Sequence, residues 1–215
     1  MRGIPDKIIN LIVTDPPYDL DLHRGSGVAD RESVKVFKAI NQGFGNGLDP
    51  RQLLVHSREI LRQFNGYFWC SKKQVRIYIE FAEQNGYLYD ILTWHKNNPM
   101  PLNRHTYLPD TEYCVFIREK KSTFINGLSK NLYKKYWVTP RQISNGHPTP
   151  KPIEIMRTQI LLSSNPGDII LDPFCGSGIT LIAAKSLGRK YIGADINPDY
   201  CRLSEDKLRQ EELFG

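Results

Sequence analysis

The sequence of 215 residues lacks the features of membrane proteins, secreted disulfide-rich proteins and disordered chains. No apolar stretch approaches the ~20 residues that a membrane-spanning helix needs, and the first apolar run is interrupted by Asn10. The four cysteines form no CxxC pair, so neither a zinc-binding spacing nor a disulfide framework is present and we expect reduced thiols. The content of 40% hydrophobic and 24% charged residues indicates a globular protein, which we expect to be cytoplasmic.

Basic residues exceed acidic ones, 29 against 23, and the net charge of +6 favours a polyanionic partner. The excess is concentrated in residues 118–146, which contain seven basic residues and one acidic residue, interleaved with aromatic side chains. This mixture is typical of nucleic-acid surfaces, so we interpret 118–146 as a candidate target-recognition segment. Its candidate nucleic-acid-binding residues are Lys130, Lys134, Lys135, Tyr136 and Arg141. A solvated face whose aromatics pack into the core is the competing interpretation.

Strand-like and helix-like segments alternate along the chain, which predicts an α/β fold with a largely parallel sheet. The expected strands are 8–13, 67–70, 88–94, 112–117, 169–171 and 191–194, and the expected helices are 50–64, 73–85, 153–163, 179–187 and one after Pro198. In such a sheet the ligand crevice lies outside the carboxyl ends of the strands. The segments 15–18 and 172–178, which follow two of these strands, are therefore expected to face one cavity.

Residues 172–178, Asp-Pro-Phe-Cys-Gly-Ser-Gly, follow a strand and open a helix. Gly176 and Gly178 allow a tight turn beside a ligand that faces helical N–H groups. Asp195 follows the next strand, where a carboxylate can accept both hydroxyls of a ribose, so the pattern favours an adenosyl ligand. A phosphate-binding loop fits poorly because its Lys is missing, and Leu181 replaces the third glycine of a dinucleotide fingerprint. An ordinary turn, with Asp195 helping to start the last helix, is the alternative.

Residues 15–18, Asp-Pro-Pro-Tyr, place an acceptor and an aromatic ring after a buried strand, on a backbone that two prolines hold extended. A nucleobase amine offers N–H donors to Asp15 and to the Pro16 carbonyl, while its ring can stack on Tyr18. A strand-ending turn with a half-buried tyrosine is the competing interpretation.

Taken together, these motifs resemble those of the DNA amino-methyltransferases, which methylate the exocyclic amine of adenine or cytosine from S-adenosylmethionine. The resemblance is carried by TDPPY at 14–18, HPTPKP at 147–152, DPFCGSG at 172–178 and GADINPDY at 193–200, in the order of the group whose catalytic motif precedes its cofactor motif. It implies a Rossmann-like methyltransferase sheet with permuted motif order and a basic target-recognition insertion. The chain would then comprise a catalytic half (1–117), the recognition segment (118–146) and a cofactor-binding half (147–215).

The resemblance also assigns expected roles to single residues. The pocket for a flipped base would be formed by Asp15, Pro16, Pro17 and Tyr18. The methyl donor would be lined by Phe174, Gly176 and Gly178, with Asp172 near its amino-acid end, Asp195 on its ribose, and Thr149 with Lys151 near its carboxylate. A solvated role for Lys151 stays open, and we expect His147 to be structural. No metal is expected.

Asp rather than Ser at the start of the catalytic motif favours adenine over cytosine. The alternatives are cytosine, RNA or protein methylation by the same site, and a non-catalytic DNA-binding remnant. DNA is the expected partner, and the resemblance leaves open a homodimer and a companion restriction endonuclease. The chain departs from the family pattern in two places. It starts too late for the usual preceding strand with a Gly-Asp pair, and Ile179 stands where Thr is common.

Overall fold

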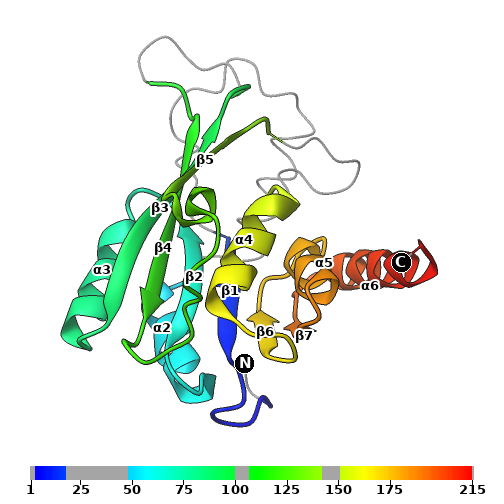
Figure 1. The fold of residues 1–215 in the computed structure, drawn as a ribbon, viewed down its shortest axis with the longest axis horizontal. Helices are drawn as coiled ribbons and strands as arrows, with labels where there is room; N and C mark the ends of the chain where they lie inside the picture. The colour runs from blue at the N-terminus through cyan, green and yellow to red at the C-terminus, as the bar shows by residue number, and fades with distance from the viewer. Residues whose placement is uncertain (1–2, 18–47, 100–106, 142–150, 215) are drawn as a thin grey trace.

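The computed structural model describes residues 3–17, 48–99, 107–141 and 151–214, which form one seven-stranded sheet with helices on both faces (Figure 1). In chain order the elements are β1 (Leu11–Thr14), α2 (Pro50–Ile60), β2 (Asn65–Cys70), α3 (Val75–Gln84), β3 (Leu88–Lys96), β4 (Thr111–Arg118), the 3₁₀ helix η1 (Lys130–Tyr133), β5 (Tyr136–Thr139), α4 (Ile153–Ser163), β6 (Ile169–Asp172), α5 (Ile179–Ser186), β7 (Lys190–Gly193) and α6 (Pro198–Phe214). The α/β class and the alternation expected from the sequence are confirmed.

The strands lie in the order β5-β3-β4-β2-β1-β6-β7. β1 pairs in parallel with β2 and β6, β6 with β7, and β3 with β5, whereas β4 runs antiparallel to both of its neighbours. The largely parallel sheet is therefore confirmed, and β4 is its reversed strand. Because of this reversal, the first residues of β4 lie at the edge where β1, β2 and β3 end.

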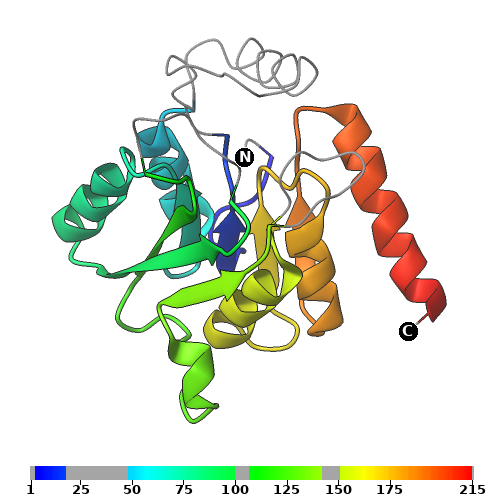
Figure 2. The ribbon, with the colours of Figure 1, turned by 90° about the horizontal axis from the view of Figure 1, so that it is seen from above.

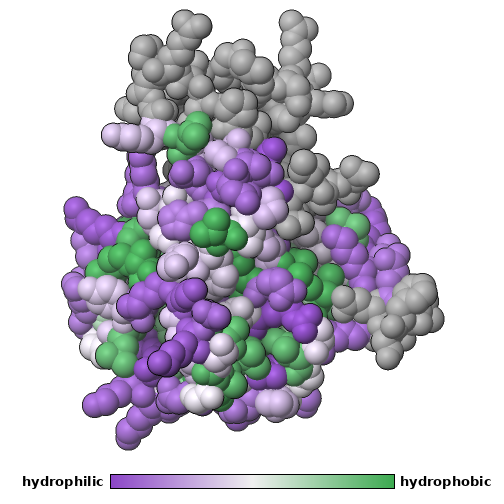
Figure 3. Space-filling model, turned by 45° about the horizontal axis from the view of Figure 1, so that its top comes forward, coloured by the Kyte–Doolittle hydropathy of each residue, from purple (hydrophilic) through white to green (hydrophobic). Residues whose placement is uncertain are grey.

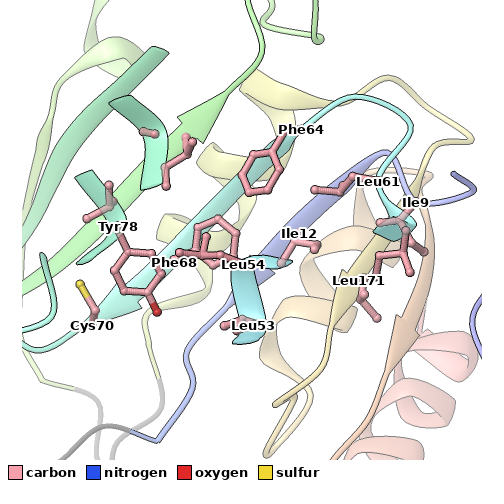
Figure 4. Packing of buried hydrophobic residues seen from close by; sticks show 14 residues of the cluster. Ile9, Ile12, Leu53, Leu54, Leu61, Phe64, Phe68, Cys70, Tyr78 and Leu171 are labelled. Atoms are coloured by element: carbon pink, nitrogen blue, oxygen red, sulfur yellow. The ribbon is translucent and has the colours of Figure 1, made fainter. Parts of the chain in front are cut away.

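β1 is buried because it has hydrogen-bonded neighbours on both sides and helices above and below. All four of its residues are buried. Ile12 packs into the cluster on the α2 and α3 face (Figure 4), whereas Leu11 and Val13 pack into the cluster on the α4 and α5 face. This alternation is the side-chain period of a strand, and it explains why the segment is nearly all apolar.

The helices form two layers, with α2 and α3 on one face of the sheet and α4 and α5 on the other (Figures 1 and 2). α2 begins as the sequence predicts, because the carboxylate of Asp49 accepts the N–H of Arg51 at 3.0 Å and Pro50 is the first helical residue. α6 lies outside α5 (Figure 2) and contacts it through Leu208.

The surface carries hydrophobic side chains only as separate small groups among hydrophilic ones on the face shown in Figure 3. Exposed apolar side chains include Val138 on β5, Leu88 and Ile91 on β3, and Val55 on α2. Scattered exposure of this kind is normal for a folded protein and indicates no large apolar patch on this face. Among the described residues, no helix is long and apolar enough to span a membrane.

Candidate active site

The two strand ends singled out in the sequence lie side by side in the sheet. β1 and β6 are parallel neighbours with Ile12 opposite Leu171, so Asp15 and Asp172 emerge at the same edge. The hydroxyl of Thr14 donates to Oδ1 of Asp172 at 2.8 Å and ties the two ends together. The shared edge predicted from strand order is thus confirmed for these residues, although Tyr18 lies outside the described residues.

Asp172 is buried at the end of β6, and only 3% of it is exposed. Burial raises the pKa of its carboxyl to about 6, although hydrogen bonds from Thr180, Thr14 and the Phe174 N–H oppose the shift. The N–H of Phe174 donates to Oδ1 at 3.1 Å, so this carboxylate also shapes the start of the following turn.

The turn after β6 depends on glycines. Gly176 and Gly178 have φ values of 49° and 81°, in the left-handed region that favours glycine. A Cβ on Gly178, which caps α5, would lie 2.9 Å from Cβ of Ser204 on α6. The turn is held against the end of β7 because Cys175 N–H donates to the Ala194 carbonyl at 2.9 Å.

Asp195 follows β7 and bridges the two segments of the expected donor site. Its Oδ2 accepts the N–H of Gly176 at 3.0 Å, and its Oδ1 accepts the N–H of Asn197 at 2.8 Å. The interpretation that Asp195 helps to start the last helix fits its contact with Asn197 in the loop before α6, whereas its ribose-binding role stays a prediction. Gly193, next to this loop, has no room for a side chain, since a Cβ there would lie 2.5 Å from Leu181.

A chain of four alternating charges begins at Asp15. The ammonium of Lys151 contacts Oδ2 of Asp15 and Oε2 of Glu112, the latter at 2.8 Å. Oε1 of Glu112 receives the ammonium of Lys96 at 2.5 Å. Only 4% of the Lys151 side chain is exposed, against 31% of the Asp15 side chain, so the aspartate is the member that solvent reaches most.

The opposed charges and the burial set the protonation of this cluster. Burial raises the pKa of Asp15, and the neighbouring Glu112 adds to the shift while Lys151 and Lys96 oppose it. For Glu112, burial is outweighed by Lys151 and Lys96, which lower its pKa to about 2. Oδ1 of Asp15 is buried and has no hydrogen-bond partner among the described residues.

Sequence reasoning missed Glu112, Lys96 and Trp69 as members of the site. Glu112 reaches it because β4 is reversed, so that its second residue lies opposite Trp94 near the end of β3. The indole of Trp69 lies beneath the Lys151 ammonium, 5.0 Å from it. The available signal was that Lys96 is the last residue of β3 and Glu112 the second residue of β4, so that both are charged residues at strand ends.

The other predicted site residues are placed as follows. Pro16 and Pro17 continue from Asp15 beyond β1, and Phe174 follows Asp172. Lys151 lies before α4 with its ammonium on Asp15, and its predicted contact with a donor carboxylate is untested. Thr149 and His147 lie outside the described residues.

The candidate nucleic-acid-binding residues divide between two parts of the sheet. Arg141 follows β5 and its N–H donates to Asn98 just beyond β3, so it lies at the edge that carries Asp15. Lys135 pairs instead with Asp90, six residues before Lys96 on β3 and so roughly 20 Å back along the strand. η1, which begins at Lys130, and Lys134, which follows it, precede β5 and belong to this distant part.

Two of the aromatic residues in the segment pack into the fold. Phe124 and Trp137 join the cluster on the α4 face, and the hydroxyl of Tyr133 donates to the Ile125 carbonyl at 3.0 Å. Tyr136 is the most exposed of the four, at 48%. The recognition role of the segment stays a prediction.

The comparisons with known proteins agree with this geometry. Residues 9–206 match the N6_N4 methyltransferase family model, described as DNA methylase. The type II methyltransferase M2.LlaDCHI of Lactococcus lactis subsp. cremoris is 29% identical over 100% of this chain and 87% of its own length. The type II methyltransferase M2.DpnII of Streptococcus pneumoniae is 30% identical over 94% of this chain and 83% of its own length.

Solved structures show the same fold. M1.HpyAVI in its SAM complex superposes with a TM-score of 0.63 at 28% identity, covering 94% of this chain and 90% of that chain. The cytosine-N4-specific PvuII DNA methyltransferase shares the fold with a TM-score of 0.64 at 20% identity, covering 94% of this chain and 80% of that chain. A match over nearly the whole chain, with the motif residues gathered at one sheet edge, shows that the protein belongs to the N6/N4 DNA methylase family.

Proposed function

We propose that this protein transfers a methyl group from S-adenosylmethionine to the exocyclic amine of adenine in DNA. The observation that carries the proposal is the state of Asp15 at the end of β1. One carboxylate oxygen is held by Lys151, and the other, Oδ1, has no hydrogen-bond partner among the described residues. An acceptor of this kind suits an amine, which brings N–H donors.

The residues at the ends of β6 and β7 fit the methyl donor. S-adenosylmethionine supplies a methyl group on a positively charged sulfur. Asp195 places a carboxylate beside the Gly176 backbone, where it can receive ribose hydroxyls, and the left-handed conformation of Gly176 and Gly178 gives the turn its shape beside this carboxylate. Asp172 adds a second carboxylate one strand away from Asp15. This arrangement supports donor and amine meeting at one edge.

Asp15 assists the transfer by accepting a hydrogen bond from the amine. The nitrogen lone pair of an aromatic amine is delocalised into the ring, and an acceptor aimed at its hydrogen favours the pyramidal form. As the nitrogen lone pair forms the new N–C bond, the electron pair of the C–S bond stays on sulfur and positive charge develops on nitrogen. The carboxylate stabilises this charge and can take the proton that nitrogen must lose. Holding the partners in line provides the remaining acceleration.

Adenine is favoured over cytosine because the motif begins with Asp15. In the family pattern, Asp at this position indicates adenine more often than Ser does. In a duplex the base must first leave the stack, at a cost of a few kcal/mol. Arg141 lies at the same edge and supplies a cation for the DNA backbone. A companion restriction endonuclease and a homodimer stay predictions of the resemblance.

The test is an assay with methyl-labelled donor and DNA of many sequences, followed by digestion and mass spectrometry of the nucleosides. We expect N6-methyladenine. Formation of N4-methylcytosine would show that cytosine is the target base. Label found only in RNA or only in protein would show that DNA is not the substrate. If no product forms, calorimetry detects no donor binding and the protein still binds DNA with a steep salt dependence, the non-catalytic DNA-binding alternative is correct.

Donor binding provides a separate prediction. Asp195→Ala removes one acceptor for the ribose and the acceptor of two backbone N–H groups, so we expect the Kd for S-adenosylmethionine to rise about tenfold, since a hydrogen bond to a charged group contributes about 1.5 kcal/mol or more. Calorimetry measures it. Asp199→Ala is the matched control, because Asp199 is exposed in the first turn of α6. Equal affinities for both variants would contradict the assignment.

A further inference from the structure

Lys151 is the most buried member of the charge cluster that it forms with Asp15, Glu112 and Lys96. Its ammonium lies between the carboxylates of Asp15 and Glu112 and over the ring of Trp69. The exposed fractions of the side chains rise outward from it, from 4% for Lys151 to 15% for Glu112 and 31% for Asp15. The cluster therefore has an anchored inner cation and an outer carboxylate, of which one oxygen, Oδ1, is buried and has no hydrogen-bond partner among the described residues.

A contribution to folding stability is a poor explanation for burying these four charges. Removing a lysine from water is costly, and well-packed apolar side chains often replace a buried ion pair with no loss of stability. Lys96, Glu112, Lys151 and Asp15 together balance two positive with two negative charges, which makes burial tolerable. What an apolar replacement could not supply is a fixed orientation and charge state for Asp15.

Lys151 makes the two oxygens of Asp15 different from each other. Oδ2 contacts the ammonium, whereas Oδ1 is left without a hydrogen-bond partner among the described residues. An unrestrained aspartate could turn either oxygen toward a substrate. Here one oxygen stays on Lys151, so only the other oxygen, Oδ1 in this structure, is left for a donor.

We propose that Lys151 is a positioning residue for methyl transfer, which holds Asp15 by Oδ2 so that Oδ1 receives the target amine, while Glu112 holds Lys151 and is itself held by Lys96. The inference rests on the proposed function, because it names what orients the carboxylate of that reaction. It differs from the role implied by the sequence resemblance, in which Lys151 lies near the carboxylate of the methyl donor.

The charges around Asp15 give the proposal an electrostatic signature. Lys151 and Lys96 face Asp15 as cations and Glu112 as an anion, and the titratable groups Cys70 on β2, Cys114 on β4 and Asp172 on β6 also lie nearby. Burial keeps the two thiols protonated by raising the pKa of Cys70 to about 12 and that of Cys114 well above its ordinary value. Loss of Lys151 should therefore raise the pKa of Asp15, and loss of the Glu112 charge should lower it.

The first experiment compares Lys151→Met with the wild type. We expect kcat on DNA to fall by about 100-fold, the loss typical of a displaced reacting group, with the Kd for S-adenosylmethionine and the KM for DNA within twofold. The control is Lys190→Met, an exposed lysine at the start of β7 on the opposite edge, which should match the wild type. A large rise in the donor Kd with unchanged kcat would overturn the proposal in favour of a donor-carboxylate contact.

The second experiment uses the opposite electrostatic effects of Lys151 and Glu112. The acid limb of the kcat profile should move to higher pH in Lys151→Met and to lower pH in Glu112→Gln, and carboxyl ¹³C NMR of the donor-free protein should show Asp15 titrating in the same order. If Lys151→Met fails to fold, the double variant Lys151→Met/Glu112→Gln removes one charge of each sign and should still lose about 100-fold in kcat. A purely structural role predicts no opposed movement of the acid limb of kcat, because Asp15 would then not set the rate, and the absence of that movement would overturn the proposal.

Failure of the inference and failure of the proposed function give different results. A wild type that binds donor but methylates no DNA refutes the function, while the NMR titration still reports on Asp15 and Lys151. A wild type that methylates DNA as fast as Lys151→Met refutes the inference and leaves the function intact.

Discussion

Asp15→Asn is expected to lower kcat by about 10³-fold while the protein still folds and binds S-adenosylmethionine. Catalysis by a positioned acid or base typically contributes 10²–10⁴-fold, and the amide lacks both the negative charge and the capacity to take the amine proton. The amide keeps the shape of the carboxylate, and Lys151 keeps Glu112 as its counter-ion at 2.8 Å. The loss should therefore appear in kcat rather than in donor affinity.

The measurement is single-turnover methylation of DNA, with donor binding followed by calorimetry. Asp6→Asn is the matched control, since Asp6 is exposed ahead of β1, at the far end of that strand from Asp15. Turnover within a few-fold of the wild type would refute the role of Asp15. If both donor binding and turnover were lost, the substitution would instead have altered the structure of the sheet edge around Asp15.

Asp172→Asn is expected to change how stability depends on pH. The pKa of Asp172 is raised to about 6 in the folded protein, from 3.8 in the unfolded chain, because burial penalises the charge. Below pH 3.8 the carboxyl is protonated in both the folded and the unfolded protein, so its burial does not lower the free energy of unfolding. As the pH rises through about 6, the folded protein has to bury the ionised form, and the free energy of unfolding falls by about 2–3 kcal/mol. Asn has no charge to bury and keeps an oxygen for the Thr14 and Phe174 donors.

Urea unfolding at pH 4.5 and pH 7.5 tests this prediction. Relative to the variant, the wild type should lose about 2 kcal/mol between the two pH values, so that Asp172→Asn is the more stable protein at neutral pH. We also expect the variant to bind the methyl donor less well, a common cost where a site keeps a strained charge. Parallel stability curves for the two proteins would show that Asp172 is not the buried titrating group.

Much of the fold follows from local pattern, as the strand around Leu11–Thr14 illustrates. Its apolar run and the prolines after it mark a buried strand and its end, and both are found. The direction of β4 was not predictable in this way. A run such as Tyr113 to Ile117 buries its side chains equally well in either direction, and only pairing with β2 and β3 settles the choice.

β5 was missed for a related reason. It has only four residues, alternately exposed and half-buried, and it lies within a segment whose charges suggested a nucleic-acid surface. Trp137 shows the physical cause, since it packs against Trp69 with ring centroids 6.4 Å apart. An aromatic side chain near lysines can pack into the core or stack on a ligand, and the sequence alone does not distinguish these two roles.

The candidate site was predictable to the extent that each group sits in a motif with its own chemistry. Asp15, Asp172 and Asp195 follow strands, and strand order brings the first two together. The contacts of Lys151 were not predictable, because its partners come from β1 and β4 and depend on the reversal of β4. Long-range charge pairing of this kind becomes visible only with the folded chain.

The reversed β4 also affects how this architecture can diversify. The connection that leaves β3 after Lys96 and enters β4 at Thr111 both starts and finishes beside the reacting groups. Its length can therefore change while every backbone pairing in the sheet is kept, because the register of β3 and β4 is set by residues 88–95 and 111–118. Insertions and deletions in this connection would therefore cost little in folding, because loop-closure entropy grows slowly with length, while they change the chain that starts and ends beside the reacting groups.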